Sequence, residues 1–387
     1  RFKGFTDAWE QRKLGDVYTE RNKRGNDSLK ILSVSIHHGV SNEELDSNTL
    51  GKEVRRSEDK SLYKHVYLGD LVLNMMRAWQ GAVGVVKSEA MVSPAYITAV
   101  PSAELYPLFM DFYLRRDEAI GQMNNLSYGV TDFRKRLYWD SFVKVLCHIP
   151  TVAEQERITV FFTHLDDTIA LHQRKLTLFN QLKETYLKQM FPQNEENMSV
   201  LRFADFSEPW EQRKWSETVD ISTEMVNPKT GEYDSLPHIG PGNIESFIGR
   251  ILDNVKSVKE DNLIGVKLQF YPCDVIYGKI NPQLGKYAMV DFEGLASADS
   301  YVLNTKNGVS QTFLFTILQG TSFYKYSVSV SMRTGMPKIN RDELNQYSYS
   351  APSVVEQEKI GHFFKQLDGT IALHQRKVTL LKRLKEA

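Results

Sequence analysis

The chain has very little cysteine and no long apolar run. Only two of its 387 residues are cysteines, Cys147 and Cys273. Two distant thiols argue against a disulfide framework and against a cysteine zinc cluster, and they indicate a reducing compartment. No stretch approaches the roughly 18 apolar residues of a membrane span, and no secretory signal opens the sequence. We therefore expect a cytoplasmic protein that does not enter a membrane.

The chain also lacks an excess of charge of either sign. Lys and Arg number 48, and so do Asp and Glu, so the formal net charge is zero. Non-specific electrostatic binding to nucleic acid should therefore be modest. Local basic clusters are present at Arg21, Lys23 and Arg24 and at positions 134–136. Each could form a phosphate-binding face, with an ordinary solvated surface as an equally good interpretation.

Short catalytic motifs are missing as well. The sequence has no Gly-rich dinucleotide loop, no phosphate-binding P-loop, no HExxH, no GxSxG and no paired CxxC. The adjacent carboxylates Asp166 and Asp167 belong to a segment that occurs twice, and the second copy has Gly369 in place of Asp167. A catalytic pair would not be expected to lose a member in this way. We predict no catalytic residue, no metal site and no cofactor in this chain.

The sequence is dominated by an internal duplication. PTVAEQERITVFFTHLDDTIALHQRKLTLFNQLKE, from Pro150, returns as PSVVEQEKIGHFFKQLDGTIALHQRKVTLLKRLKE, from Pro352. FTDAWEQRKLGD, from Phe5, returns as FSEPWEQRKWSE, from Phe206. Between these repeated strings the two copies have diverged almost completely. This pattern predicts one scaffold that presents two different recognition surfaces.

The repeated strings predict two long helices. Apolar residues recur with alternating spacings of four and three, which is typical of a coiled-coil seam, and two such seams most simply pack on each other. His172 and His374 occupy one seam position in each copy, where we interpret them as register-setting polar residues rather than metal ligands. The seam positions are Ile158, Phe162, Leu165, Ile169, His172, Leu176 and Phe179, and then Ile360, Phe364, Leu367, Ile371, His374, Val378 and Leu381.

The diverged regions mix short β-rich runs with turns and with helical patterns at 108–124 and 311–319. Asp70 and Ser127 in the first copy have the same spacing as Asp274 and Ser331 in the second, which indicates a shared fold. We predict an α+β protein with two similar mixed domains. The predicted parts are domain 1 at 1–149, a helix at 150–191, a linker at 192–203, domain 2 at 204–351 and a helix at 352–387.

Side chains suited to reading base edges follow comparable landmarks in the two copies. Arg, Lys, Asn and Gln make the bidentate contacts that distinguish base pairs, and these residues differ between the copies as two targets would require. An ordinary loop role is an equally good interpretation of any single position. The candidates are Arg77, Trp79, Gln80, Tyr128, Thr131, Arg134, Lys135 and Arg136 in the first copy, and Tyr277, Lys279, Asn281, Arg333, Thr334, Lys338, Asn340 and Arg341 in the second.

These linked features resemble the specificity subunit of type I restriction-modification systems. The resemblance covers essentially the whole chain. It rests on EQE near the start of each long helix, the LDxTIALHQRK core, the WEQRK opening of each copy and SMRTGMPKIN in the second. It implies two target recognition domains separated by an antiparallel coiled coil with pseudo-twofold symmetry. Each domain is then expected to read one half of a bipartite double-stranded DNA target.

The resemblance also implies partners. The subunit itself is expected to be non-catalytic, with two modification subunits that bind S-adenosylmethionine and methylate adenine. ATP- and Mg-dependent restriction subunits are expected to join them. The alternatives are a stand-alone or homodimeric DNA-binding protein of antirestriction type and, less well supported, a fused restriction-modification polypeptide. The last residue, Ala387, falls short of the position equivalent to Phe191 and the first is Arg1 rather than Met, so we expect ends that are either trimmed or disordered.

Overall fold

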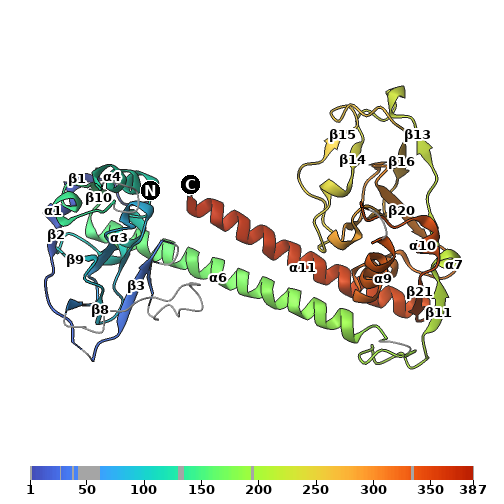
Figure 1. Ribbon diagram of the computed structural model, residues 1–387, viewed down its shortest axis with the longest axis horizontal. Helices are drawn as coiled ribbons and strands as arrows, with labels where there is room; N and C mark the ends of the chain where they lie inside the picture. The colour runs from blue at the N-terminus through green and yellow to red at the C-terminus, as the bar shows by residue number, and fades with distance from the viewer. Residues whose placement is uncertain are drawn as a thin grey trace. The chain divides into compact units, whose positions relative to one another are not determined.

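The computed structural model describes residues 2–26, 28–36, 39–41, 62–129, 135–192, 196–332 and 335–386. The chain forms two compact units, Arg1–Thr168 and Ile169–Ala387. The boundary falls inside the long helix α6, Val152–Gln189 (Figure 1). The domain limits expected from the sequence, with a change at residue 150, therefore stay a prediction. Among the described residues no helix is both long enough and apolar enough to cross a membrane.

The described residues of the first unit form two four-stranded sheets and one two-stranded sheet. The sheets have the strand orders β2-β9-β6-β7 and β4-β3-β8-β5, and β1 pairs antiparallel with β10. The strands are β1 Glu10–Lys13, β2 Tyr18–Glu20, β3 Ile31–Ser35, β4 Gly39–Ser41, β5 Lys64–Val66, β6 Leu71–Asn74, β7 Val83–Val85, β8 Ala90–Val92, β9 Tyr96–Pro101 and β10 Leu146–Ile149. The helices before α6 are α1 Leu14–Val17, η2 Ala78–Gln80, α3 Pro107–Tyr113, α4 Asp117–Leu126 and α5 Trp139–Phe142.

The second unit follows the same plan with a larger second sheet. Its sheets have the orders β12-β20-β17-β18 and β13-β16-β19-β14-β15, and β11 pairs antiparallel with β21. The strands are β11 Glu211–Lys214, β12 Val219–Ile221, β13 Met225–Val226, β14 Pro237–Ile239, β15 Lys256–Ser257, β16 Lys267–Phe270, β17 Val275–Gly278, β18 Tyr287–Met289, β19 Gly294–Ala296, β20 Ser300–Thr305 and β21 Ser348–Ala351. The helices are α7 Trp215–Thr218, η4 Pro228–Thr230, η5 Pro241–Asn243, η6 Pro282–Leu284, α8 Gln311–Gln319, α9 Thr321–Ser331, α10 Arg341–Asn345 and α11 Val354–Glu386.

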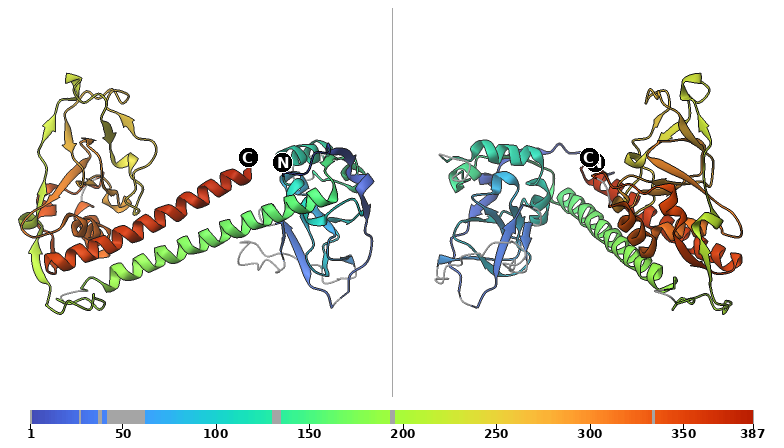
Figure 2. Two further views of the ribbon diagram at one scale, coloured as in Figure 1. Left: turned by 180° about the vertical axis from the view of Figure 1, so that it is seen from behind. Right: turned by 45° about the vertical axis from the view of Figure 1, so that its right-hand side comes forward.

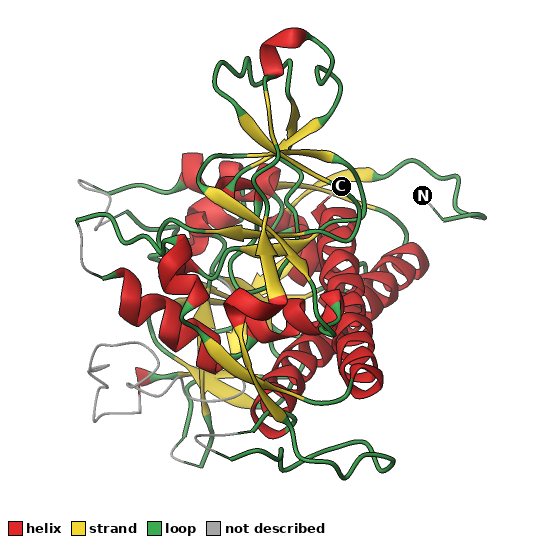
Figure 3. Cartoon of the chain, turned by 90° about the vertical axis from the view of Figure 1, so that its right-hand side faces the viewer, coloured by secondary structure: helices red, strands yellow, loops and turns green. Residues whose placement is uncertain are grey.

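Equivalent hydrogen bonds show that the same fold is built twice. The Asp70 carboxylate accepts from the Tyr67 backbone N–H at 2.8 Å, and the Asp274 carboxylate accepts from the Tyr271 N–H at 2.9 Å. Each aspartate caps the turn that starts the central strand of its unit. The α+β class expected from the sequence is confirmed, and the mixture of helix and strand is apparent in Figure 3.

The repeated WEQRK string closes the mixed domain of each unit. In the first unit its strand β1 lies against β10, directly before α6, and in the second unit β11 lies against β21, directly before α11. The hydrogen-bond pattern continues past both pairs, from the Leu14 N–H to the Val145 carbonyl and from the Trp215 N–H to the Tyr347 carbonyl, each at 2.8 Å. The two ends of each diverged region are therefore held together by repeated residues.

A buried glutamine ties the start of α6 to the first unit. The Gln155 side chain is fully buried. Its Oε1 accepts from the Tyr106 N–H at 2.9 Å, and its Nε2 donates to the Glu104 and Pro150 carbonyls, each at 2.9 Å. Leaving such buried groups without a partner costs about 1–3 kcal/mol each, so the amide is held firmly in place.

The second copy repeats this arrangement. Gln357 is also buried, and its Oε1 accepts from the Ser310 N–H at 3.0 Å. Its Nε2 donates to the carbonyls of Gly308 at 3.1 Å and Pro352 at 2.8 Å. The glutamine of the repeated EQE string therefore docks each long helix on the mixed domain of its own copy. The first glutamate of the EQE string lies in the first turn of the helix, where the helix dipole favours acidic residues. The glutamine that follows it instead makes the docking hydrogen bonds.

In the second unit the end of α6 and α11 form an antiparallel pair. Lys183 lies 2.7 Å from the Asp368 carboxylate, while the Tyr186 and Phe363 rings lie 5.1 Å apart further along. As residue numbers increase along α6, the numbers of their partners on α11 decrease, so the two helices are antiparallel. This part of α6 runs beside α11 in all the views of Figures 1 and 2. The expected antiparallel coiled coil is confirmed.

The first positions of each predicted seam have a different neighbour. Ile360 and Phe364 belong to the hydrophobic core of the second unit, and Ile158 packs against the core of the first. The Phe162 ring stacks on Phe112 with centroids 5.4 Å apart. The heptad interpretation was wrong for these positions, because a docking face and a coiled-coil seam can share the same spacing of apolar residues.

The histidine pair is a polar contact within the coiled coil. The Nδ1 atoms of His172 and His374 are 2.8 Å apart, and Phe179 stacks on the His374 ring. One Nδ1 must donate and the other must accept, so the contact cannot form when both rings are protonated. Burial lowers the pKa of His374, with further lowering by His172, Lys175 and Lys377.

The pair should make stability depend on pH. Because the pKa of His374 is lower in the folded chain than in the unfolded chain, this stabilisation is fully present above the ordinary histidine pKa of about 6.5 and is lost as the pH falls below that value. We expect the thermal unfolding midpoint to fall between about pH 7.5 and 5.5, and His374→Leu to remove part of that fall. His362→Leu, an exposed position of α11, is the control. An equal fall in His374→Leu and the wild type would contradict this role.

Candidate nucleic-acid interface

The two predicted clusters of the second copy lie together in the fold. The segment after β17 runs antiparallel to the segment before α10, with a β-bridge between Ile280 and Lys338. The Asn281 N–H donates to the Pro337 carbonyl at 2.7 Å, and the Ile339 N–H donates to the Lys279 carbonyl at 3.0 Å. Two short segments far apart in the sequence thereby form one surface, which we call the paired loops, residues 279–285 and 335–340.

Cations gather around one aromatic ring at the paired loops. The Lys279 ammonium lies 5.2 Å from the centroid of the Tyr301 ring, and the Arg341 guanidinium carbon lies 5.8 Å from it. Burial lowers the pKa of Lys279, and the charges of Lys338 and Arg341 lower it further, while Asp299 acts in the opposite direction. The site is therefore electropositive.

Two of the predicted base readers are engaged by the fold itself. The Asn340 side chain accepts from the Glu343 N–H at 2.9 Å and the Glu343 carboxylate accepts from the Asn340 N–H, which is a capping box at the start of α10. The Arg341 guanidinium donates to the carbonyls of Ile221 at 3.1 Å and Ser222 at 2.8 Å. Asn281 is half-buried in a left-handed backbone conformation, with φ of 51°.

The prediction that Tyr277 reads DNA was wrong. Its side chain is only 2% exposed, and its ring packs edge-on against Phe323 with centroids 5.5 Å apart. Burial raises its pKa well above the ordinary tyrosine value. Strand β17 is covered on both faces, since Tyr277 and Val275 lie in one hydrophobic cluster and Ile276 lies in another.

The first unit has a surface at the equivalent place. The Leu137 N–H donates to the Met75 carbonyl at 2.9 Å, as Ile339 does to Lys279 in the second unit. The Lys135 ammonium lies 5.3 Å from the Trp79 ring and donates to the Asn124 side chain at 2.5 Å. The predicted clusters of this copy are therefore also brought together.

The remaining candidates of the first copy are surface residues. Tyr128 is 54% exposed and stacks on Tyr138, with ring centroids 4.8 Å apart. Arg136 is exposed and pairs with Tyr128 in an antiparallel bridge. Arg77 and Gln80 are also exposed. Thr131, Arg134, Arg333 and Thr334 lie outside the described residues.

The basic cluster near residue 21 serves the scaffold. Arg21 is an ion-pair partner of the buried Asp70 at 2.6 Å, and its guanidinium carbon lies 4.7 Å from the centroid of the Tyr67 ring. The Lys23 ammonium also contacts Tyr67. The charge of Arg21 is neutralised by a carboxylate, so the structure does not support a phosphate-binding role for that residue.

Sequence reasoning missed an exposed aromatic residue beside the paired loops. Phe247 is 48% exposed and has a φ of 62°, which is unusual for a bulky residue. Its N–H donates to the Gly285 carbonyl and its own carbonyl accepts from the Tyr287 hydroxyl, both at 2.9 Å. The Gly249 that follows could have indicated a turn, but nothing in the sequence places this turn at the paired loops.

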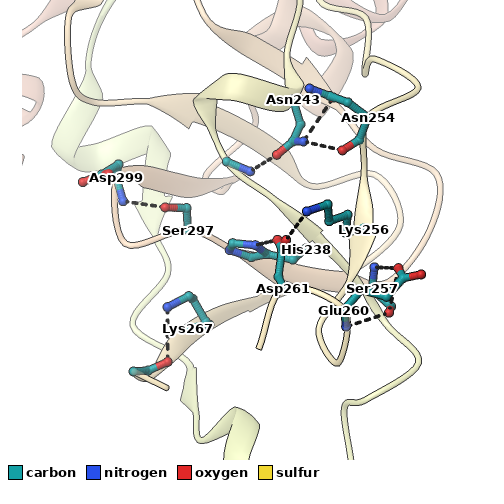
Figure 4. Close-up of polar contacts among 12 residues, drawn as sticks. His238, Asn243, Asn254, Lys256, Ser257, Glu260, Asp261, Lys267, Ser297 and Asp299 are labelled. Atoms are coloured by element: carbon teal, nitrogen blue, oxygen red, sulfur yellow. Dashed lines mark hydrogen bonds and ion pairs between the residues drawn. The ribbon is translucent and has the colours of Figure 1, made fainter. Parts of the chain in front are cut away.

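A second group of polar side chains lies on the five-stranded sheet (Figure 4). His238 Nδ1 lies 2.7 Å from an Asp261 oxygen, and the Lys256 ammonium lies 3.7 Å from the other oxygen of that carboxylate. Asn243 donates to the Asn254 side chain at 3.2 Å. These contacts hold a long connection against the sheet. In the described parts of the chain, no group of three or more His, Cys, Asp or Glu side chains could hold a metal ion.

Comparison with known proteins agrees with this architecture. Residues 208–383 match the sequence profile of the type I restriction modification DNA specificity domain. A stretch of 158 residues is 30% identical to the type I restriction enzyme EcoDI specificity subunit of Escherichia coli. That match covers 41% of this chain and 34% of the relative, so it spans about a third of the relative's length.

Two solved structures share the fold. The type I restriction-modification S subunit from M. genitalium has a TM-score of 0.61 at 10% identity, covering 100% of this chain and 95% of that one. A chain from a structure on complex assembly and conformational transition of the type I restriction-modification system has a TM-score of 0.51 at 18% identity, covering 100% and 97%.

The two units share one fold and present different side chains at equivalent loops. By the profile match, residues 208–383 are similar to the DNA specificity domain of type I restriction-modification systems.

Proposed function

We propose that this chain is the DNA-reading subunit of a cytoplasmic type I restriction-modification complex, and that each unit reads one half of a bipartite target. The observation that carries this proposal is that the two units have different side chains at structurally equivalent positions. Strand register makes Ile97 equivalent to Tyr301, since Leu73 pairs with Ile97 as Tyr277 pairs with Tyr301. The first unit therefore has an apolar side chain where the second has the ring that carries two cations.

Catalysis is assigned to partner subunits in this proposal. The chain would supply the target sequence, two modification subunits would bind S-adenosylmethionine and methylate adenine, and restriction subunits would supply ATP- and Mg-dependent cleavage. The match of residues 208–383 to a DNA specificity domain supports this division, because the matched profile describes the part that selects DNA. A duplicated subunit with two docking surfaces suits two copies of one partner.

Exposed leucines on the long helices are the candidate docking surfaces. Their spacing of seven and four residues places each set along one helix face. All of them are more than a third exposed, and the same three positions recur in both copies. We call each set a leucine stripe: Leu171, Leu178 and Leu182 on α6, and Leu373, Leu380 and Leu384 on α11. Exposed apolar stripes of this kind mark helix-binding surfaces, so we assign one modification subunit to each.

Mapping of methylated adenines tests the function. The chain and its modification subunit would be expressed in a host without other methyltransferases, and the modified genome sequenced. We expect one target made of two different short sequences separated by a fixed unspecified gap, because the two surfaces differ. A continuous motif, or two identical halves in inverted repeat, would contradict the proposal.

Placing a positive charge in each leucine stripe tests the docking surfaces. Leu178→Arg with Leu380→Arg should abolish assembly with modification subunits, and either change alone should remove one of the two copies, as measured by light scattering after gel filtration. Gln173→Arg with Gln375→Arg, at exposed positions on another face of the same helices, is the matched control. Unchanged assembly would contradict docking at the stripes. A chain that dimerises alone through the stripes would support the homodimer alternative instead.

A further inference from the structure

Three positively charged side chains lie at the paired loops of the second unit. Lys279 and Arg341 share the Tyr301 ring, and Lys338 lies across the β-bridge from Ile280. Among the residues that the structure describes, none of these three cations has a carboxylate partner in an ion pair. Asp299 raises the pKa of Lys279 but forms no ion pair with it, so the three like charges together favour the approach of an anion.

The Arg341 side chain and the Lys279 backbone are held in place by the fold, so this part of the site is preorganised. Two guanidinium donors of Arg341 are fixed on backbone carbonyls of residues 221 and 222, which leaves its remaining N–H groups for a ligand. The Lys279 backbone is anchored by the Ile339 N–H at 3.0 Å. A ligand that binds here would therefore lose little affinity to ordering of the protein.

This geometry suits a phosphate better than a base edge. Reading guanine requires both arms of an arginine fork to face the base, but the Arg341 fork already donates to Ile221 and Ser222. Lys279 and Lys338 are ammonium groups, which act on phosphate as point charges without a directional pattern. Asn340, the neighbouring candidate, is committed to capping α10.

We propose that Lys279, Lys338 and Arg341 form a clamp for one phosphate of the DNA backbone. This phosphate clamp rests on the proposed function, because it assumes that DNA lies on the paired loops. It assigns these residues to positioning the duplex and leaves base reading to other side chains of the surface, such as Asn281. The first unit has Met75 and Ile97 at the places of Lys279 and Tyr301, so the clamp is a property of the second unit alone.

The salt dependence of binding tests the phosphate clamp. The assembled complex would be titrated with a duplex that carries the mapped target, and with a duplex that has one base pair changed in the second half-site. We expect Lys338→Ala to weaken binding to both duplexes by the same severalfold factor. The slope of log affinity against log salt should become shallower by about one, as for the loss of one phosphate contact. Lys279→Ala should behave in the same way.

Two controls accompany the titration. Lys338→Arg keeps the charge and should restore the wild-type slope, whereas Lys229→Ala removes another exposed lysine of the same unit and should leave it unchanged. A change in discrimination between the two duplexes would overturn the clamp, because it would make Lys338 a base reader. An unchanged slope would also overturn it. A wild-type complex with no preference for the mapped target would refute the proposed function itself.

Discussion

The structure depends on a buried amide at the start of each long helix. The buried amides of Gln155 and Gln357 are each satisfied by one backbone N–H and two backbone carbonyls. Because unpaired buried groups are costly, each helix can begin only where its own recognition domain presents that N–H and those carbonyls. The EQE string is repeated for this reason, and the same contact places every later residue of the helix relative to its domain.

Divergence is tolerated because repeated residues close each domain. The strand from WEQRK pairs with the strand that leads into the long helix, so both ends of the variable region are fixed. Between these ends, a backbone pattern recurs while the side chains change: Met75 and Lys279 accept equivalent hydrogen bonds, yet one is apolar and the other cationic. Main-chain contacts carry the fold, which leaves the surface free to change.

Much of this organisation could be predicted from the sequence. The duplication, the long helices and the Asp70 and Asp274 landmarks need only local patterns. Tyr277 could not be placed, because a strand covered on both faces has no alternation that separates inside from outside. Asn340 followed by Glu343 three residues later is the pattern of a capping box, so the sequence alone could have predicted that Asn340 caps a helix rather than reads bases. The paired loops join segments that only the folded sheet brings together, so their charge cluster required the structure.

The central claim is that the diverged interiors decide the target and the repeated frame does not. Its most direct test exchanges residues 20–148 for the matching domain of a type I specificity subunit with a different target, reconstitutes the proposed complex with the modification partner and maps the methylated adenines. The account predicts that one half of the target changes, while the other half stays the same. A change in both halves, or in neither, would contradict it.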